Sequence, residues 1–273
     1  MFLSWLFAPL QYSFMTRGLL ASVIVGVLCA VMGTYVVLRG MAFLGDALAH
    51  AILPGVAIAY LLHGSLLAGA LIAAVIIALS IGVFSKQGTI KEDTAIGILF
   101  AAALSLGVAL ISSLHTYAVD LTHILFGNVL GVSSTDLWLT AGLGVAVLLA
   151  VFLLYKPFMV ISFDPVLAAT MRLPAELLRN LMLVLLALTV VVSLQTVGVG
   201  LAAAMLVTPA ATAYLLTRRL AAMMFVSAAL GASSSVIGLY LSYYLNIVSG
   251  SAIVLAATAF FLLAFLWKRM RRG

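Results

Sequence analysis

Long stretches without Asp, Glu, Lys or Arg dominate this sequence, and the longest of them, residues 220–267, has 48 residues. A transmembrane helix needs about 20 apolar residues. Of the 273 residues, 66% are hydrophobic and 7% are charged, whereas about 25% are charged in an ordinary soluble domain. The only cysteine, Cys29, leaves no internal disulfide to form. A soluble enzyme, a secreted disulfide scaffold and a disordered chain are therefore excluded, and an all-α polytopic membrane protein remains.

The charge-free stretches predict nine transmembrane helices, with eight as the alternative count. Three stretches are long enough for two spans each, because polar or glycine-containing segments interrupt them near their middles. The six stretches are residues 18–38, 47–85, 94–119, 137–155, 180–217 and 220–267. We expect the whole chain, 1–273, to form one membrane domain, in which residues 1–17 are an interfacial segment on the outer side.

The placement of the basic residues predicts the orientation of the chain. Nine spans put the two termini on opposite sides of the membrane. Of the 13 Lys and Arg residues, only Arg17 then falls on the N-terminal side. Because cytoplasmic loops carry an excess of Lys and Arg, we expect a cytoplasmic C-terminus. The net charge of +6 is explained in this way and does not indicate a nucleic-acid partner.

The cytoplasmic loop at residues 156–179 contains a short helix pattern. Asp164 is a suitable N-cap and Pro165 a suitable first helical residue. Apolar residues, among them Leu167 and Met171, recur after them at helical spacing. This pattern predicts an amphipathic helix of about two turns, which either covers the inner ends of the spans or docks a cytoplasmic partner. The chain has no phosphate-binding G-x-x-x-x-G-K-[ST] loop, so transport against a gradient needs ATP handled by another subunit or an ion gradient.

Asp46 and His50 are the leading candidates for a metal site. At a spacing of four residues they share one helix face, and a carboxylate with an imidazole makes half of a site for a divalent transition metal. A two-fold dimer would double the ligands to four, enough for zinc or manganese. Alternatively, Asp46 caps the second span and His50 packs at a helix interface. Pro54 and Gly55, which follow, are expected to kink this span or to let backbones approach closely.

A looser polar group lies on the outer side. His115, Asp120 and His123 could attract or relay cations at the outer mouth of a path. The alternative is a solvated loop with ordinary polar residues.

Five segments of the chain resemble, in the same order, the permease subunits of ATP-binding-cassette importers for zinc, manganese and iron. The first contains LRGMAFLGDALAHAILPG and the fourth contains LVTPAATAYLL, and these two are the most specific. The segments are residues 32–62, 126–137, 163–174, 197–219 and 238–266.

The resemblance implies a fold like that of type II importers, a bacterial inner-membrane location and no catalytic chemistry in this chain. It also implies a homodimer that works with two cytoplasmic ATP-binding subunits and an extracellular or periplasmic metal-binding protein. Asp46 and His50 map onto an acid and a histidine on the permeation path, and the cargo is a transported metal, not a resident cofactor. Asp164, Pro165, Leu167 and Met171 map onto the helix that couples to the ATPase.

Two points stay open at the level of sequence. Arg172 stands where the family often has glycine before Leu-Pro, which puts the shape of the coupling loop in doubt. Hydropathy places Asp46 near the cytoplasmic end of its span, so either residues 39–45 fold inward or the pair forms an inner gate.

A proton- or sodium-coupled secondary transporter, with Asp46 as the ion carrier, is the alternative function. An intramembrane metalloprotease is disfavoured because the chain lacks H-E-x-x-H.

Overall fold

The computed structural model describes residues 9–85, 90–112 and 129–271. Within them, nine helical segments are long and apolar enough to cross a membrane, which confirms the predicted count. They are α2 (Ser13–Leu38), α3 (Leu44–Ala51) with α4 (Leu53–Leu61) as one span, α5 (Leu66–Phe84), α6 (Glu92–Ser112), α8 (Ser134–Leu153), α11 (Ala175–Val197), α12 (Val199–Leu216), α13 (Leu220–Leu245) and α14 (Ser249–Met270). Four short helices complete the described chain: η1 (Pro9–Gln11), η2 (Val129–Gly131), α9 (Tyr155–Phe163) and α10 (Pro165–Thr170).

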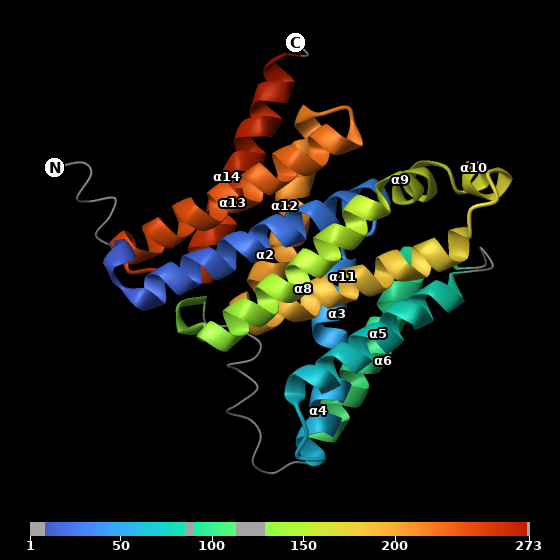
Figure 1. Ribbon diagram of the computed structural model, residues 1–273, viewed down its shortest axis with the longest axis horizontal. Coiled ribbons are helices and arrows are strands. Elements are labelled where there is room, and N and C mark those ends of the chain that lie inside the picture. Colours follow the sequence, from blue (N-terminus) through green and yellow to red (C-terminus); the bar gives the residue numbers. More distant parts are fainter. Residues whose placement is uncertain (1–8, 86–89, 113–128, 272–273) are drawn as a thin grey trace.

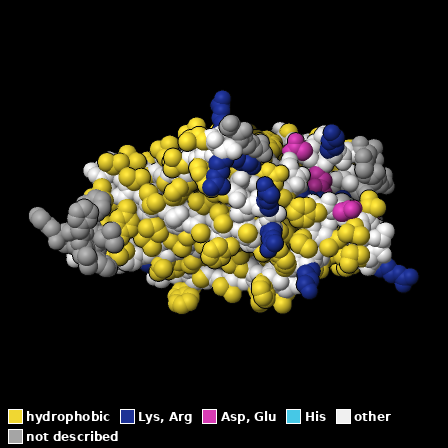
Figure 2. All heavy atoms as spheres, turned by 90° about the horizontal axis from the view of Figure 1, so that it is seen from above, with side chains coloured by type: hydrophobic (Ala, Val, Ile, Leu, Met, Phe, Trp, Pro, Cys, Tyr) yellow, Lys and Arg dark blue, Asp and Glu magenta, His cyan; other side chains and the backbone are white. Residues whose placement is uncertain are grey.

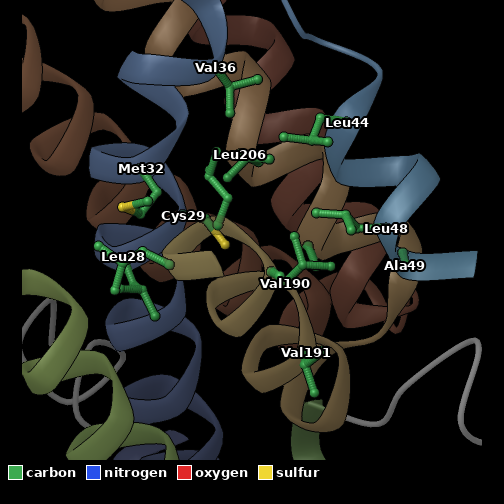
Figure 3. Packing of buried hydrophobic residues seen from close by; sticks show 14 of the residues in the cluster. Leu28, Cys29, Met32, Val36, Leu44, Leu48, Ala49, Val190, Val191 and Leu206 are labelled. Carbon is green, nitrogen blue, oxygen red and sulfur yellow. The ribbon is translucent and has the colours of Figure 1, made fainter. Parts of the chain in front are cut away.

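The centre of the molecule is formed by α2, the α3–α4 span, α11 and α12, which are the most buried spans. Helix α2 packs against α8, α12 and α13, and α3 packs against α6, α11 and α12 (Figure 1). Apolar side chains from these helices meet around Leu206 of α12, with Val36 of α2 on one side and Leu44 and Leu48 of α3 on another (Figure 3). The core therefore forms where α2, α3 and α12 converge.

Small residues bring α2 close to its neighbours. A Cβ atom on Gly26 would lie 2.9 Å from the carbonyl oxygen of Gly231, so α2 and α13 touch through their backbones. Ser227 donates a hydrogen bond across this contact to the carbonyl of Ala30, at 2.8 Å. The sulfur of Cys29 is buried and lies 3.2 Å from the hydroxyl of Ser193 on α11. Close approach of small residues and interhelical hydrogen bonds are the contacts that hold helices together in lipid.

The second span is broken in its middle, as Pro54 and Gly55 predicted. Helix α3 ends at Ala51 and α4 begins at Leu53. Pro54 has no amide hydrogen to donate to the carbonyl of His50, which interrupts the helical hydrogen bonding. A Cβ atom on Gly55 would lie 2.3 Å from the carbonyl oxygen of Gly69, so α4 and α5 are also in backbone contact. The break comes directly after the candidate metal pair.

Consecutive spans run in opposite directions, so every second helix end lies on the same side of the molecule. Charged side chains gather at the helix ends on one of these sides. Figure 2 shows Lys and Arg side chains grouped over part of one face, with a broad hydrophobic surface beside them. Arg218 and Arg219 lie between α12 and α13, and Lys268 and Arg269 lie in the last turn of α14. The hydrophobic surface is the part of the molecule that suits the lipid interior.

Two boundaries differ from the sequence-based expectation. Helix α2 begins at Ser13, so residues 13–17 of the expected interfacial segment are the first residues of a 26-residue helix. Arg17 then lies within α2 and donates a hydrogen bond to the carbonyl of Ser13. In the loop predicted over residues 156–179, α9 precedes the predicted short helix. Its sequence contains Lys156 and Pro157, which resemble loop residues and concealed the helical spacing of the apolar residues around them.

Candidate functional site

Asp46 and His50 share one face of α3. Oδ1 of Asp46 lies 3.8 Å from Nε2 of His50, one helical turn away. The Asp46 side chain is 46% exposed and the His50 side chain 31% exposed, whereas most residues between them are buried. The pair is therefore open on one side of the molecule, although the span that carries it is largely buried.

The surroundings of the pair explain how it is held. The ring of Phe100, on α6, lies 6.1 Å from the His50 ring, and Phe43 meets Phe100 edge to face at 5.6 Å. On the opposite side, a Cβ atom on Gly45 would lie 2.7 Å from Cδ2 of Leu206, so α3 presses directly on α12. These aromatic contacts were not foreseen, because the one-dimensional pattern does not say which face of α6 meets α3.

The contacts of two glycines show how α3 lies relative to the end of α2. Gly33 of α2 and Gly45 of α3 both pack against Leu206. Arg39 directly follows the last residue of α2. Gly33 lies six residues before Arg39, which is roughly 9 Å along the helix axis. The link after Arg39 therefore turns back into the protein, and Asp46 lies inward from the end of α2. Figure 1 shows α3 at the centre of the ribbon diagram, next to α11.

In the part of the chain that the structure describes, the Asp46–His50 pair has only two metal ligands. Among the described residues, no group of three or more His, Cys, Asp or Glu side chains could hold a metal ion. The pair offers one carboxylate and one imidazole, a set that suits manganese, iron or zinc. A closed metal site would need further ligands beyond this pair.

A second polar cluster lies at the ends of four helices and was not predicted from the sequence. Nη2 of Arg39, directly after α2, donates to Oε1 of Glu92, the first residue of α6, at 2.5 Å. Arg179 of α11 lies 3.9 Å from the same oxygen and donates to the carbonyl of Gly82, at the end of α5. Burial lowers the pKa of Arg39, and the neighbouring Glu92 carboxylate raises it. The only sequence signal was that each of these charges adjoins an apolar stretch.

The short helix predicted after Asp164 is present as α10, and Asp164 caps it. Oδ1 of Asp164 accepts hydrogen bonds from the backbone amides of Val166 and Leu167, both at 2.9 Å. The helix ends through a bond from the amide of Leu173 to the carbonyl of Ala168, with Arg172 in the left-handed region at φ 55°. This ending is the Schellman geometry in which glycine is the usual residue. Arg172 thus adopts the same turn at a steric cost.

Four large apolar side chains of α10 and its flanks are exposed, whereas Ala168 is buried. Val166, Leu167 and Met171 are exposed, as is Phe163 at the end of α9. These four residues form an exposed apolar face on and beside α10. The outer residues His115, Asp120 and His123 lie outside the described residues.

The chain has extensive similarity to known transport proteins. A model of the ABC 3 transport family matches residues 11–268. The manganese transport system membrane protein MntC of Halalkalibacterium halodurans is 49% identical over 94% of this chain and 88% of its own length. A probable iron transport system membrane protein of Haemophilus influenzae is 39% identical over 98% of both chains.

A solved structure agrees with these relatives. PsaBC from Streptococcus pneumoniae, in complex with Fab, matches with a TM-score of 0.84 and 41% identity, over 97% of this chain and 95% of the other. The match covers all nine spans of the described chain. The chain is a membrane permease of the ABC 3 transport family.

Proposed function

We propose that two copies of this chain form the translocation path of an ATP-driven importer of divalent transition metal. We propose manganese as the cargo ahead of zinc and iron, because several relatives are named as manganese transport proteins. The observation that carries the proposal is the open Asp46–His50 pair, which presents two metal ligands 3.8 Å apart and lacks the others. A chain with half a site needs a second copy to complete it.

The electrostatics of a dimeric site favour a divalent cation. An ion that leaves water for a low-dielectric interior without compensation costs tens of kcal/mol on a Born estimate. Two Asp46 carboxylates balance two positive charges, and two His50 imidazoles add neutral nitrogen ligands. Manganese and zinc both accept such a mixed set. Binding at this site has to be weak enough for release, since conduction fails when an ion is held too tightly.

The energy for transport is proposed to come from separate cytoplasmic ATPase subunits. We call α10 the docking helix. Its apolar face consists of Phe163, Val166, Leu167 and Met171 and is exposed on the side of the basic helix ends. Two ATP-binding subunits, one on each copy, would cover these faces. An extracellular or periplasmic metal-binding protein would deliver the ion on the opposite side, with the C-terminus of the permease in the cytoplasm.

The test is metal uptake by the complete complex in proteoliposomes. We expect uptake of radiolabelled manganese to require ATP. Asp46→Asn, which keeps the shape but loses the charge, and His50→Ala are each expected to lower it at least about tenfold. Asp93→Asn is the matched control, because Asp93 is an exposed acid in the first turn of α6.

Three outcomes would contradict the proposal. Wild-type uptake by both site variants would leave Asp46 as a helix cap and His50 as an interface residue. Uptake that a proton or sodium gradient drives without ATP would establish the secondary-transporter alternative. A transport-competent complex containing a single permease copy, seen by native mass measurement, would exclude the shared site.

A further inference from the structure

The cytoplasmic cluster of Arg39, Glu92 and Arg179 joins helices that are far apart in the sequence. Glu92 bonds to Arg39, 53 positions away, and lies near Arg179, which also donates to the carbonyls of Gly82 and Ser85. The three charged side chains are largely buried. The ends of α2, α5, α6 and α11 therefore meet in the cluster around Glu92.

The cluster is incompletely paired. One carboxylate faces two guanidinium groups, so the cluster carries an excess positive charge. Nη1 of Arg39, Nε of Arg179 and Oδ1 of Asn180 are buried and have no hydrogen-bond partner among the residues that the structure describes. Partly satisfied buried polar groups are costly. A cluster that served only to hold the helix ends together would gain stability from apolar residues of similar size.

The position of the cluster connects the two parts of the candidate functional site. Arg179 lies in the second turn of α11, the helix that follows α10 after residues 171–174. Arg39 opens the link from α2 to α3, which carries Asp46. Glu92 begins α6, whose Phe100 ring contacts His50. These three residues therefore lie between α11, which follows α10, and the two helices that carry or contact the metal pair.

We propose that Glu92 is a positioning residue that couples the docking helix to the Asp46–His50 pair. Its carboxylate holds Arg39 and Arg179 together in one arrangement, and a shift of α11 changes which guanidinium it binds. Because Arg39 leads into α3 and Glu92 leads into α6, the exchange moves both walls of the metal pair. This inference rests on the proposed function, since it assumes that Asp46 and His50 carry the ion.

The experiment compares metal transported per ATP hydrolysed, at matched amounts of complete complex in proteoliposomes. Glu92→Gln removes the charge and keeps the shape, and Glu92→Asp keeps the charge. We expect Glu92→Gln to lower the transport-to-hydrolysis ratio about tenfold, because hydrogen bonds to charged groups are the stronger ones. Glu92→Asp should retain most of the ratio, and Asp93→Asn, its neighbour on the same turn, should leave it unchanged.

A structural role would give a different pattern. An unchanged ratio in Glu92→Gln, or equal losses in Glu92→Gln and Glu92→Asp, would overturn the proposal. If Glu92→Gln does not assemble, the double variant Arg39→Gln/Glu92→Gln restores a neutral pair, and a wild-type ratio in it would equally overturn the proposal. The wild-type complex is measured first: failure to move metal with ATP would refute the proposed function, whereas normal uptake with an unaltered Glu92→Gln ratio would refute only the role of Glu92.

Discussion

A Cβ atom placed on Gly33 would lie 1.7 Å from the carbonyl oxygen of Leu206. No side chain fits there, so α2 and α12 touch backbone to backbone at the centre of the protein. The contact fixes the distance between the first span and the span that contains Thr208 and Pro209. Leu206 also supports Gly45 on α3, so this contact positions the candidate metal pair as well.

We expect Gly33→Ala to destabilise the permease by about 2 kcal/mol or more, because backbone atoms must move apart to admit the methyl group. Thermal unfolding of the purified protein in detergent measures the effect. Gly97→Ala is the control, since a Cβ atom on Gly97 would meet nothing within 4 Å and alanine favours a helix. Equal unfolding temperatures for the two variants would show that the backbone contact is not formed.

Arg172 is expected to carry a conformational cost that glycine would remove. Its φ of 55° disfavours any side chain with a Cβ atom by roughly 1–2 kcal/mol. Arg172→Gly should therefore unfold at a higher temperature than Arg172→Ala, in which the charge is equally lost but the Cβ remains. A variant pair with the same stability would mean that the turn after α10 relaxes in solution.

The apolar face of the docking helix is expected to bind the ATPase. Val166→Asp would bury an unpaired charge in that contact, so we expect affinity for the ATPase to fall at least about tenfold. Val248→Asp is the matched control, because both valines are 74% exposed and Val248 lies on the opposite side, ahead of α14. Retention of the ATPase during purification measures the loss. Full retention by Val166→Asp would place the docking surface elsewhere.

Asp164 is expected to hold α10 in a helical conformation. Asp164→Ala removes both amide hydrogen bonds, at a cost of about 1 kcal/mol, whereas Asp164→Asn keeps an acceptor oxygen. We expect more ATPase subunit to be needed to reach half-maximal assembly with Asp164→Ala, and nearly the wild-type amount with Asp164→Asn. The same requirement in both variants would mean that the negative charge, and not the cap, is what matters.

The features that the sequence predicted are those determined over a few neighbouring residues. Each span has to be apolar over most of its length, so charge-free stretches located all nine spans of the described chain. Asp46 and His50 are four residues apart, and helical geometry alone places them on one face. The cap of α10 likewise depends only on Asp164 and the two amides that follow.

The features that could not be predicted from the sequence depend on contacts between distant segments. Arg39 and Glu92 are 53 positions apart, and hydropathy places both at span ends without saying that those ends meet. The packing of Phe100 on His50 depends on the rotation of α6 about its axis, which its uniformly apolar residues do not specify. Arg172 departs from the glycine expected at its position, yet adopts the glycine conformation because the hydrogen bond of Leu173 closes the turn.

The burial of Cys29 makes the native chain convenient for site-directed labelling. It is the only thiol in the sequence, and its side chain is enclosed between α2 and α11 beside Ser193. A maleimide or a thiol-reactive nitroxide reagent applied to the folded permease would find no accessible thiol. A cysteine introduced on α3, α6 or α10 would then report on its own surroundings in an otherwise native background, and the movement of each helix could be followed through the transport cycle.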